Sequence, residues 1–143
     1  SYVLSLGADP FRMASLGAVI GLPAYALIIM AAGSDTPSIF TLGVLLAGLG
    51  TGLFGHGTLT ATMLLAPRAQ VGVAMGAWGA VQATSQGVGA TIGGVVRDVA
   101  QGLDLGMGIA PAASGYVLIY ALELALMLGT LAAMWRLIDR RAD

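Results

Sequence analysis

The sequence predicts an all-α integral membrane protein with four transmembrane helices. Hydrophobic residues make up 57% of the 143-residue chain, whereas charged residues make up only 9%. The mean hydropathy is +0.90, far above the balance of a soluble globular domain. Four apolar segments are each long enough to cross the bilayer core, which takes about 20 residues of helix. Composition and segment length together therefore define the fold class.

The predicted spans cover residues 13–33, 38–66, 69–96 and 113–136, within one membrane domain over residues 1–143. Short polar segments separate them, and the second and third spans meet at the turn Pro67-Arg68. The chain begins with Ser1 and an apolar stretch that does not look like a targeting signal. We therefore expect a fragment of a larger protein.

Arginine positions predict the orientation, because cytoplasmic loops accumulate positive residues. If the spans alternate in direction, one end of the bundle carries five arginines and the other end carries only Arg97. Trp135, Phe40 and Tyr116 fall where interfacial aromatic belts are expected. We therefore expect both ends of the segment to be cytoplasmic. The five arginines of the cytoplasmic end are Arg12, Arg68, Arg136, Arg140 and Arg141.

Glycine accounts for 22 residues and falls mainly within the spans. In lipid, small residues at a spacing of four let helix backbones approach closely. This spacing predicts tight packing of the second and third spans, while the first and fourth, richer in Leu, Ile and Met, are expected to face lipid. The pairs are Gly48 with Gly52, Gly72 with Gly76, and Gly89 with Gly93.

His56, the only histidine, shares one helix face with Gly48, Gly52 and Thr60, because these residues are spaced by four. Small neighbours leave room there for a planar ligand or for a neighbouring helix. A neutral imidazole binds metals, including the magnesium of a chlorin. The alternative is a structural hydrogen bond from His56 to the next helix. Under the first interpretation, Gly52, His56 and Thr60 form a candidate pigment face, with His56 as a hypothetical axial ligand of a chlorin magnesium.

Three further polar residues lie inside the spans. Gln82 and Gln86 are one turn apart and must find hydrogen-bond partners in a medium without water. Glu123 lies about 15 Å into the last span, near the midplane, where an ionised carboxylate is costly. It either takes part in proton-coupled transport or forms a structural hydrogen bond with Tyr116 or Tyr120, which lie near the same helix face.

Several function classes are disfavoured. The chain has no cysteine, so it has no disulfide or thiolate metal site. A net charge of -1 argues against a nucleic-acid partner. No HExxH motif, phosphate-binding GxxxxGK motif or nucleophile triad is recognisable. We therefore expect the protein not to be an enzyme.

Four segments carry a specific resemblance. GADPFRMASLGA (7–18), GLFGHGTLTATM (52–63), APRAQVGVAMGAWGAVQAT (66–84) and GGVVRD (93–98) are similar to the PucC/LhaA family. This family is the bacteriochlorophyll-delivery branch of the major facilitator superfamily. The resemblance runs through most of the chain, and after Gly115 it is one of general character only.

The resemblance implies a twelve-span protein whose spans nine to twelve correspond to this chain. It implies an assembly factor for purple-bacterial light-harvesting complexes, which delivers bacteriochlorophyll to antenna polypeptides or chaperones their insertion. The implied cofactor is transiently bound bacteriochlorophyll. The implied partners are antenna polypeptides, the reaction centre complex, the lipid membrane and the remaining spans of the full-length chain. The implied location is the bacterial inner, intracytoplasmic photosynthetic membrane.

The facilitator fold also implies positions for the candidate residues. The tenth span, with His56, Gly52 and Thr60, would line the central region. The eleventh, with Gln82 and Gln86, would lie between the two halves of the protein. Two other hypotheses stay open: a proton-coupled small-molecule transporter that depends on Glu123, and a structural membrane subunit bound to a photosynthetic complex.

Overall fold

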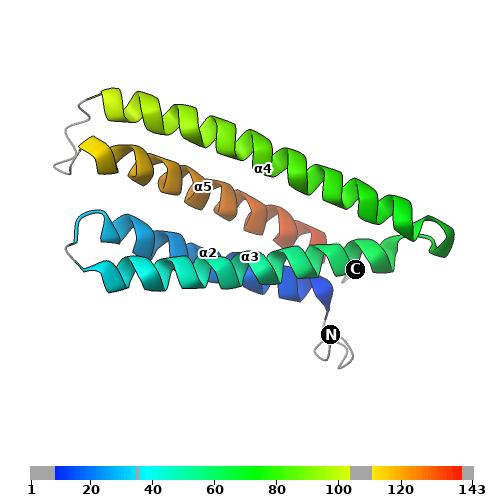
Figure 1. Cartoon of the computed structure of the whole chain (residues 1–143). Helices are drawn as coiled ribbons and strands as arrows, with labels where there is room; N and C mark the ends of the chain where they lie inside the picture. Colours follow the sequence, from blue (N-terminus) through cyan, green and yellow to red (C-terminus); the bar gives the residue numbers. More distant parts are fainter. Residues whose placement is uncertain (1–8, 35, 104–110, 140–143) are drawn as a thin grey trace.

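The computed structural model describes residues 9–34, 36–103 and 111–139, with side chains described to residue 133. These residues form helices and connecting turns, with no strand among them (Figure 1). The all-α prediction is confirmed for this part of the chain. The elements are α2 (Pro10–Ala31), α3 (Pro37–Leu65), the short 3₁₀ helix η1 (Arg68–Gln70), α4 (Val71–Gly102) and α5 (Pro111–Asp139).

Prolines and one acidic cap set the helix boundaries. The Asp9 side chain accepts a hydrogen bond of 2.9 Å from the Phe11 backbone N–H, and Pro10 opens α2. Pro37 likewise begins α3. A proline suits the first helical turn because its missing N–H would have no helical partner there. Pro67 follows the end of α3, where the chain turns through η1 into α4.

The four helices form two antiparallel pairs that lie side by side in an elongated bundle (Figure 1). In Figure 1 the pair α2–α3 lies below the pair α4–α5. Contacts are most extensive between α2 and α3, whereas α5 contacts both α4 and α2, and α3 meets α4 over a short stretch. The beginning of α2, the turn between α3 and α4, and the end of α5 all lie at one end of the bundle.

The α2–α3 pair is built on glycines spaced by seven. Gly43, Gly50 and Gly57 are the buried glycines of α3, and this spacing returns to the same face every two turns. A Cβ at Gly57 would lie 2.7 Å from the Pro10 carbonyl oxygen, and one at Gly50 would lie 2.7 Å from the Gly17 carbonyl oxygen. Only glycine therefore permits this approach of the two backbones.

The glycine pairs spaced by four behave differently. None of these six glycines has an atom within 4 Å of the place where a Cβ would lie. The described residues therefore leave these faces open. The first predicted span, α2, holds more buried residues than any other described helix and packs against α3 and α5, while Leu16, Val19 and Met30 stay exposed on its outer side. In α4, by contrast, only Ala100 is buried.

The α4–α5 pair has its closest contact near the α4–α5 connection. A Cβ at Gly115 would lie 2.7 Å from the Arg97 carbonyl oxygen. The buried Ser114 hydroxyl donates a hydrogen bond of 3.5 Å to the Ala100 carbonyl oxygen. The α4 helix continues to Gly102, six residues beyond the predicted end of the third span.

Three described segments are long and apolar enough to cross a membrane: Pro10–Ala31, Pro37–Leu65 and Ala113–Ala133. The described α4 does not reach the same apolarity, although its 32 residues make it the longest helix. Its sequence contains eight glycines, three glutamines and the pair Arg97-Asp98, and it contains no leucine. The predicted first, second and fourth spans thus correspond to apolar helices of spanning length, and α4 is a helix made largely of small residues.

Candidate functional site

His56 lies on an open face of α3. His56, Gly52 and Gly48 are all exposed, and nothing lies within 4 Å of a Cβ built on either glycine. The Thr60 hydroxyl donates a hydrogen bond of 2.8 Å to the His56 carbonyl oxygen. The oxygen of the Thr60 hydroxyl can still accept a hydrogen bond. Among the described residues no side-chain hydrogen bond holds the imidazole, so the alternative of a bond to a neighbouring helix is not realised there.

This face suits a large apolar ligand with one coordinating contact. Leu49 and Met63, which lie two turns before and after His56, are 53% and 42% exposed. An apolar ring could pack on these side chains beside the open glycines, and an imidazole nitrogen could bind its metal. The described residues contain no cluster of three metal-binding side chains.

Gln82 and Gln86 lie on α4, where Gln82 is partly buried and Gln86 is exposed. No side-chain hydrogen bond from either amide to another described residue is found, so the expected interhelical bonds are not seen within this part of the chain. The polar contact between α3 and α4 comes instead from Trp78. Its indole Nε1–H donates to the Thr58 hydroxyl oxygen at 3.3 Å. The Thr58 hydroxyl lies 2.9 Å from the Phe54 carbonyl oxygen and 3.1 Å from that of Gly55.

Glu123 lies at the centre of the span Ala113–Ala133. Its side chain interacts electrostatically with Tyr25 of α2 and with Tyr120 of α5 itself. The rings of Tyr25 and Tyr120 lie 5.9 Å apart between centroids and 32° apart in plane. One of the carboxyl oxygens of Glu123, Oε2, is buried without a hydrogen-bond partner. Sequence reasoning considered tyrosines on the same helix and missed Tyr25, although it is the only ionisable side chain between residues 13 and 33.

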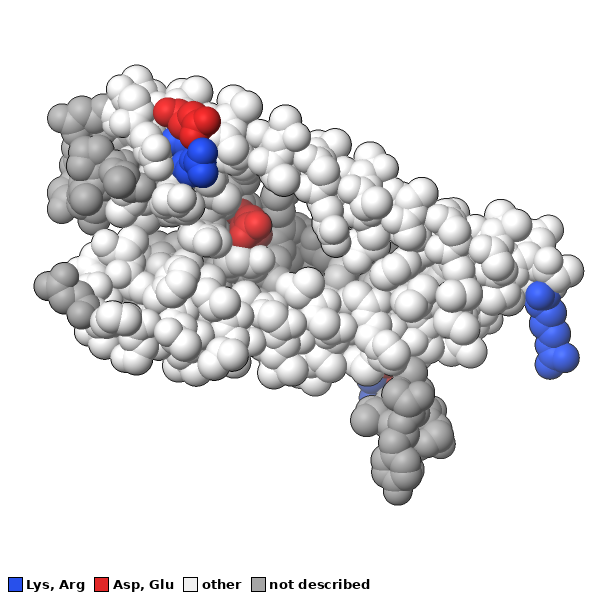
Figure 2. Space-filling model, viewed as in Figure 1, with Lys and Arg blue, Asp and Glu red and all other residues white. Residues whose placement is uncertain are grey.

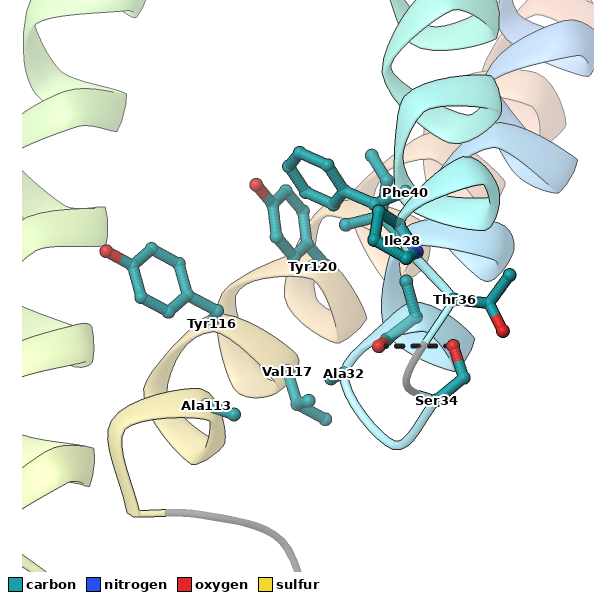
Figure 3. A pocket seen from close by; sticks show the side chains of 11 residues that line it. Ile28, Ala32, Ser34, Thr36, Phe40, Ala113, Tyr116, Val117 and Tyr120 are labelled. Atoms are coloured by element: carbon teal, nitrogen blue, oxygen red, sulfur yellow. Dashed lines mark hydrogen bonds between the residues drawn. The ribbon is translucent and has the colours of Figure 1, made fainter.

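A pocket of about 690 Å³ opens between α2, α3 and α5 at the end of the bundle that carries the α2–α3 turn. Figure 3 shows Tyr120 and Phe40 on one side of the pocket and Tyr116 pointing toward α4. The Ser34 hydroxyl donates to the Ala31 carbonyl oxygen at 3.4 Å, the bond drawn dashed in Figure 3. The pocket walls are therefore mainly apolar, with hydroxyl groups from Ser34, Thr36 and the tyrosines.

Charged side chains are sparse on the face of the molecule drawn in Figure 2. Arg12 and Arg68 belong to the end of the bundle where α2 begins and α3 ends. Arg97 belongs to the other end, where its guanidinium makes an ion pair of 2.7 Å with Asp98. This distribution agrees with the predicted alternation of the spans. The side chains of Trp135, Arg136, Arg140 and Arg141 lie outside the described residues.

The fold and these sites define the class of protein to which the chain belongs. Three apolar helices of spanning length, a partly buried carboxyl group at the centre of one of them, and wide exposed apolar faces are features of a polytopic helical membrane protein.

Comparison with known sequences identifies the family. The model of the family described as PUCC protein matches residues 1–142, so the chain belongs to this family. It is 60% identical over 98 residues to Protein PucC of Rhodovulum sulfidophilum, covering 68% of this chain and 22% of the relative. It is 53% identical over 123 residues to Protein PucC of Cereibacter sphaeroides, covering 86% and 27%.

A third relative, Protein PucC of Rhodobacter capsulatus, is 42% identical over 144 residues, covering 98% of this chain and 30% of the relative. The chain thus spans less than a third of the length of these curated relatives. No solved structure matches it.

Proposed function

We propose that the protein is an assembly factor for the light-harvesting complexes of purple photosynthetic bacteria. It would deliver bacteriochlorophyll to antenna polypeptides or chaperone their insertion into the membrane. Membership of the PUCC protein family supports this assignment. The proposal includes no enzymatic step.

The observation that carries the proposal is the open His56 face of α3. An exposed imidazole beside two glycines with empty space above them is suited to binding a broad, flat ring. Bacteriochlorophyll would supply a magnesium with a free axial position, and His56 would bind it. Gly52 would admit the ring, and Thr60, one turn from His56, would line the same face. A face this open suits transient binding, because a carrier must also release its ligand.

The longer protein context belongs to the same proposal. We infer a twelve-span protein of the major facilitator type, with α2 to α5 as its last four spans and both ends of this segment in the cytoplasm. Its location would be the inner, intracytoplasmic photosynthetic membrane. Antenna polypeptides and the reaction centre complex would be its partners, and other spans of its own chain would pack against the glycine faces of α4. The greater length of the relatives supports this view.

The test is the absorption spectrum of the full-length protein purified in mild detergent from pigment-producing cells. The wild type should carry a near-infrared band that is lost or shifted in His56→Leu. Gln86→Leu is the matched control, because it also replaces an exposed polar side chain in a helix and should leave the band unchanged. A band that survives in His56→Leu would retain pigment delivery and remove His56 as the ligand. A wild type without a band would refute pigment binding.

A second candidate function is proton-coupled transport of a small molecule. The observation that favours it is the carboxyl group of Glu123, which lies at the centre of a span with one oxygen unpartnered. If the protein is such a transporter, Glu123→Gln should abolish ion-dependent flux into vesicles. Unchanged flux would remove this candidate and would leave assembly, or a structural role beside a photosynthetic complex, as the remaining functions.

A further inference from the structure

The carboxyl group of Glu123 has an environment that favours its neutral form. It lies at the centre of the span Ala113–Ala133, where an ionised carboxylate lacks the water that would solvate it. Its Oε2 atom is buried and has no donor, whereas an ionised carboxylate needs donors on both oxygens. A protonated carboxyl group needs fewer hydrogen-bond donors than an ionised one. It can share one hydrogen bond with Tyr25 and leave the second oxygen unpaired at a lower cost.

No described cation compensates the carboxyl group. The titratable groups that interact with it are Tyr25 of α2 and Tyr120 of α5 itself. His56 is the only titratable residue of α3 and lies exposed on the open face of that helix. On α4, Arg97 is paired with Asp98 at 2.7 Å. A lone, uncompensated acid in lipid is stable when it carries its proton.

A pocket leads from one end of the bundle toward this group. The 690 Å³ pocket opens at the α2–α3 turn and reaches inward to Tyr120. The centroid of the Tyr120 ring lies 5.9 Å from that of the Tyr25 ring, and both tyrosines interact with Glu123. The hydroxyl groups that line the pocket can hold water and pass protons between its mouth and the tyrosine pair.

We propose that Glu123 is a proton-binding site, in which Tyr25 holds the neutral carboxyl group and the pocket between α2, α3 and α5 gives protons access from the α2–α3 turn end. The site does not depend on pigment binding at His56, which lies on a different helix. It is compatible with more than one of the functions considered above, since an assembly factor could use it as well as a transporter. Its test therefore reads protonation and access directly, without pigment or transport.

The first measurement is the infrared spectrum of the full-length protein in lipid vesicles at neutral pH. A C=O stretching band of a protonated carboxylic acid should be present and should disappear in Glu123→Gln. In Tyr25→Phe the band should persist at higher frequency, because the carbonyl loses a hydrogen bond. Tyr116→Phe is the matched control, since Tyr116 is on the same helix and lines the pocket without bonding Glu123. A band unchanged by Glu123→Gln, or a spectrum without the band, would overturn the proposal.

The second measurement tests the path by following deuterium exchange of the same band after transfer to heavy water. Val117→Trp should fill the pocket and slow the exchange about tenfold, equivalent to ~1.4 kcal/mol in the barrier. Thr62→Trp is the control, because Thr62 lines a separate cavity of about 310 Å³ toward the other end of the bundle. Equal exchange rates in the two variants would overturn access through the pocket.

Discussion

Replacing Gly57 by alanine should weaken the α2–α3 pair, and the structure indicates by how much. The new Cβ would lie 2.7 Å from both the Pro10 carbonyl oxygen and the Ala14 backbone nitrogen. Both atoms belong to the backbone, so neither can move aside without shifting α2. Overpacking of this kind costs about 1–3 kcal/mol. Alanine recovers part of this cost, because glycine inside a helix is less favourable by ~0.5–1 kcal/mol.

The control is Gly52→Ala, on the same helix five residues earlier. Nothing lies within 4 Å of its Cβ, so this variant gains the same helix propensity and creates no clash. The difference between the two variants then isolates the clash, at about 1–3 kcal/mol, or roughly 5- to 150-fold in the unfolding equilibrium. Denaturant unfolding of the purified protein in detergent, followed by tryptophan fluorescence, measures it. Equal stability of the two variants would refute close contact at Gly57.

Three further predictions follow from the same structure. Gly52→Leu should fill the space beside the imidazole and reduce the pigment band without reducing stability, and an unchanged band would place pigment elsewhere. Trp78→Phe should lose one hydrogen bond between α3 and α4 and cost about 0.5–1.5 kcal/mol, measured by the same unfolding assay; no loss would mean that this bond does not stabilise the pair. Because the chain lacks cysteine, single cysteines at Ser34 and Arg68 should react with an impermeant thiol reagent from opposite sides of the membrane, and labelling from one side would contradict the topology.

Composition and apolar periodicity were sufficient to predict helices in the right order, because spanning segments are long and their signal accumulates over many residues. The exact ends were harder to predict. The α4 helix continues to Gly102, since glycine and charged residues near a span end need not stop a helix.

The contacts between helices could be predicted only in part. Glycines spaced by four suggested packing at Gly52. In the structure, Gly50 and Gly57, which are spaced by seven, are the glycines that contact the backbone of α2. Both spacings are present in the sequence, and only the rotation of α3 against α2 decides between them. The partner of Glu123 was missed for the same reason, because Tyr25 lies almost a hundred residues away along the chain.

The seven-residue glycine spacing of α3 also bears on how the protein is made. Two apolar helices joined by a short turn, with backbones that fit along their length, can leave the insertion machinery together as a hairpin. The less apolar α4 has a weaker preference for lipid of its own, so its placement would depend on neighbours that are already in the membrane. Biogenesis would then proceed in two stages, with α2–α3 serving as the scaffold on which the later helices assemble. Mutations of Gly43, Gly50 or Gly57 would accordingly reduce the amount of inserted protein before they affected any activity.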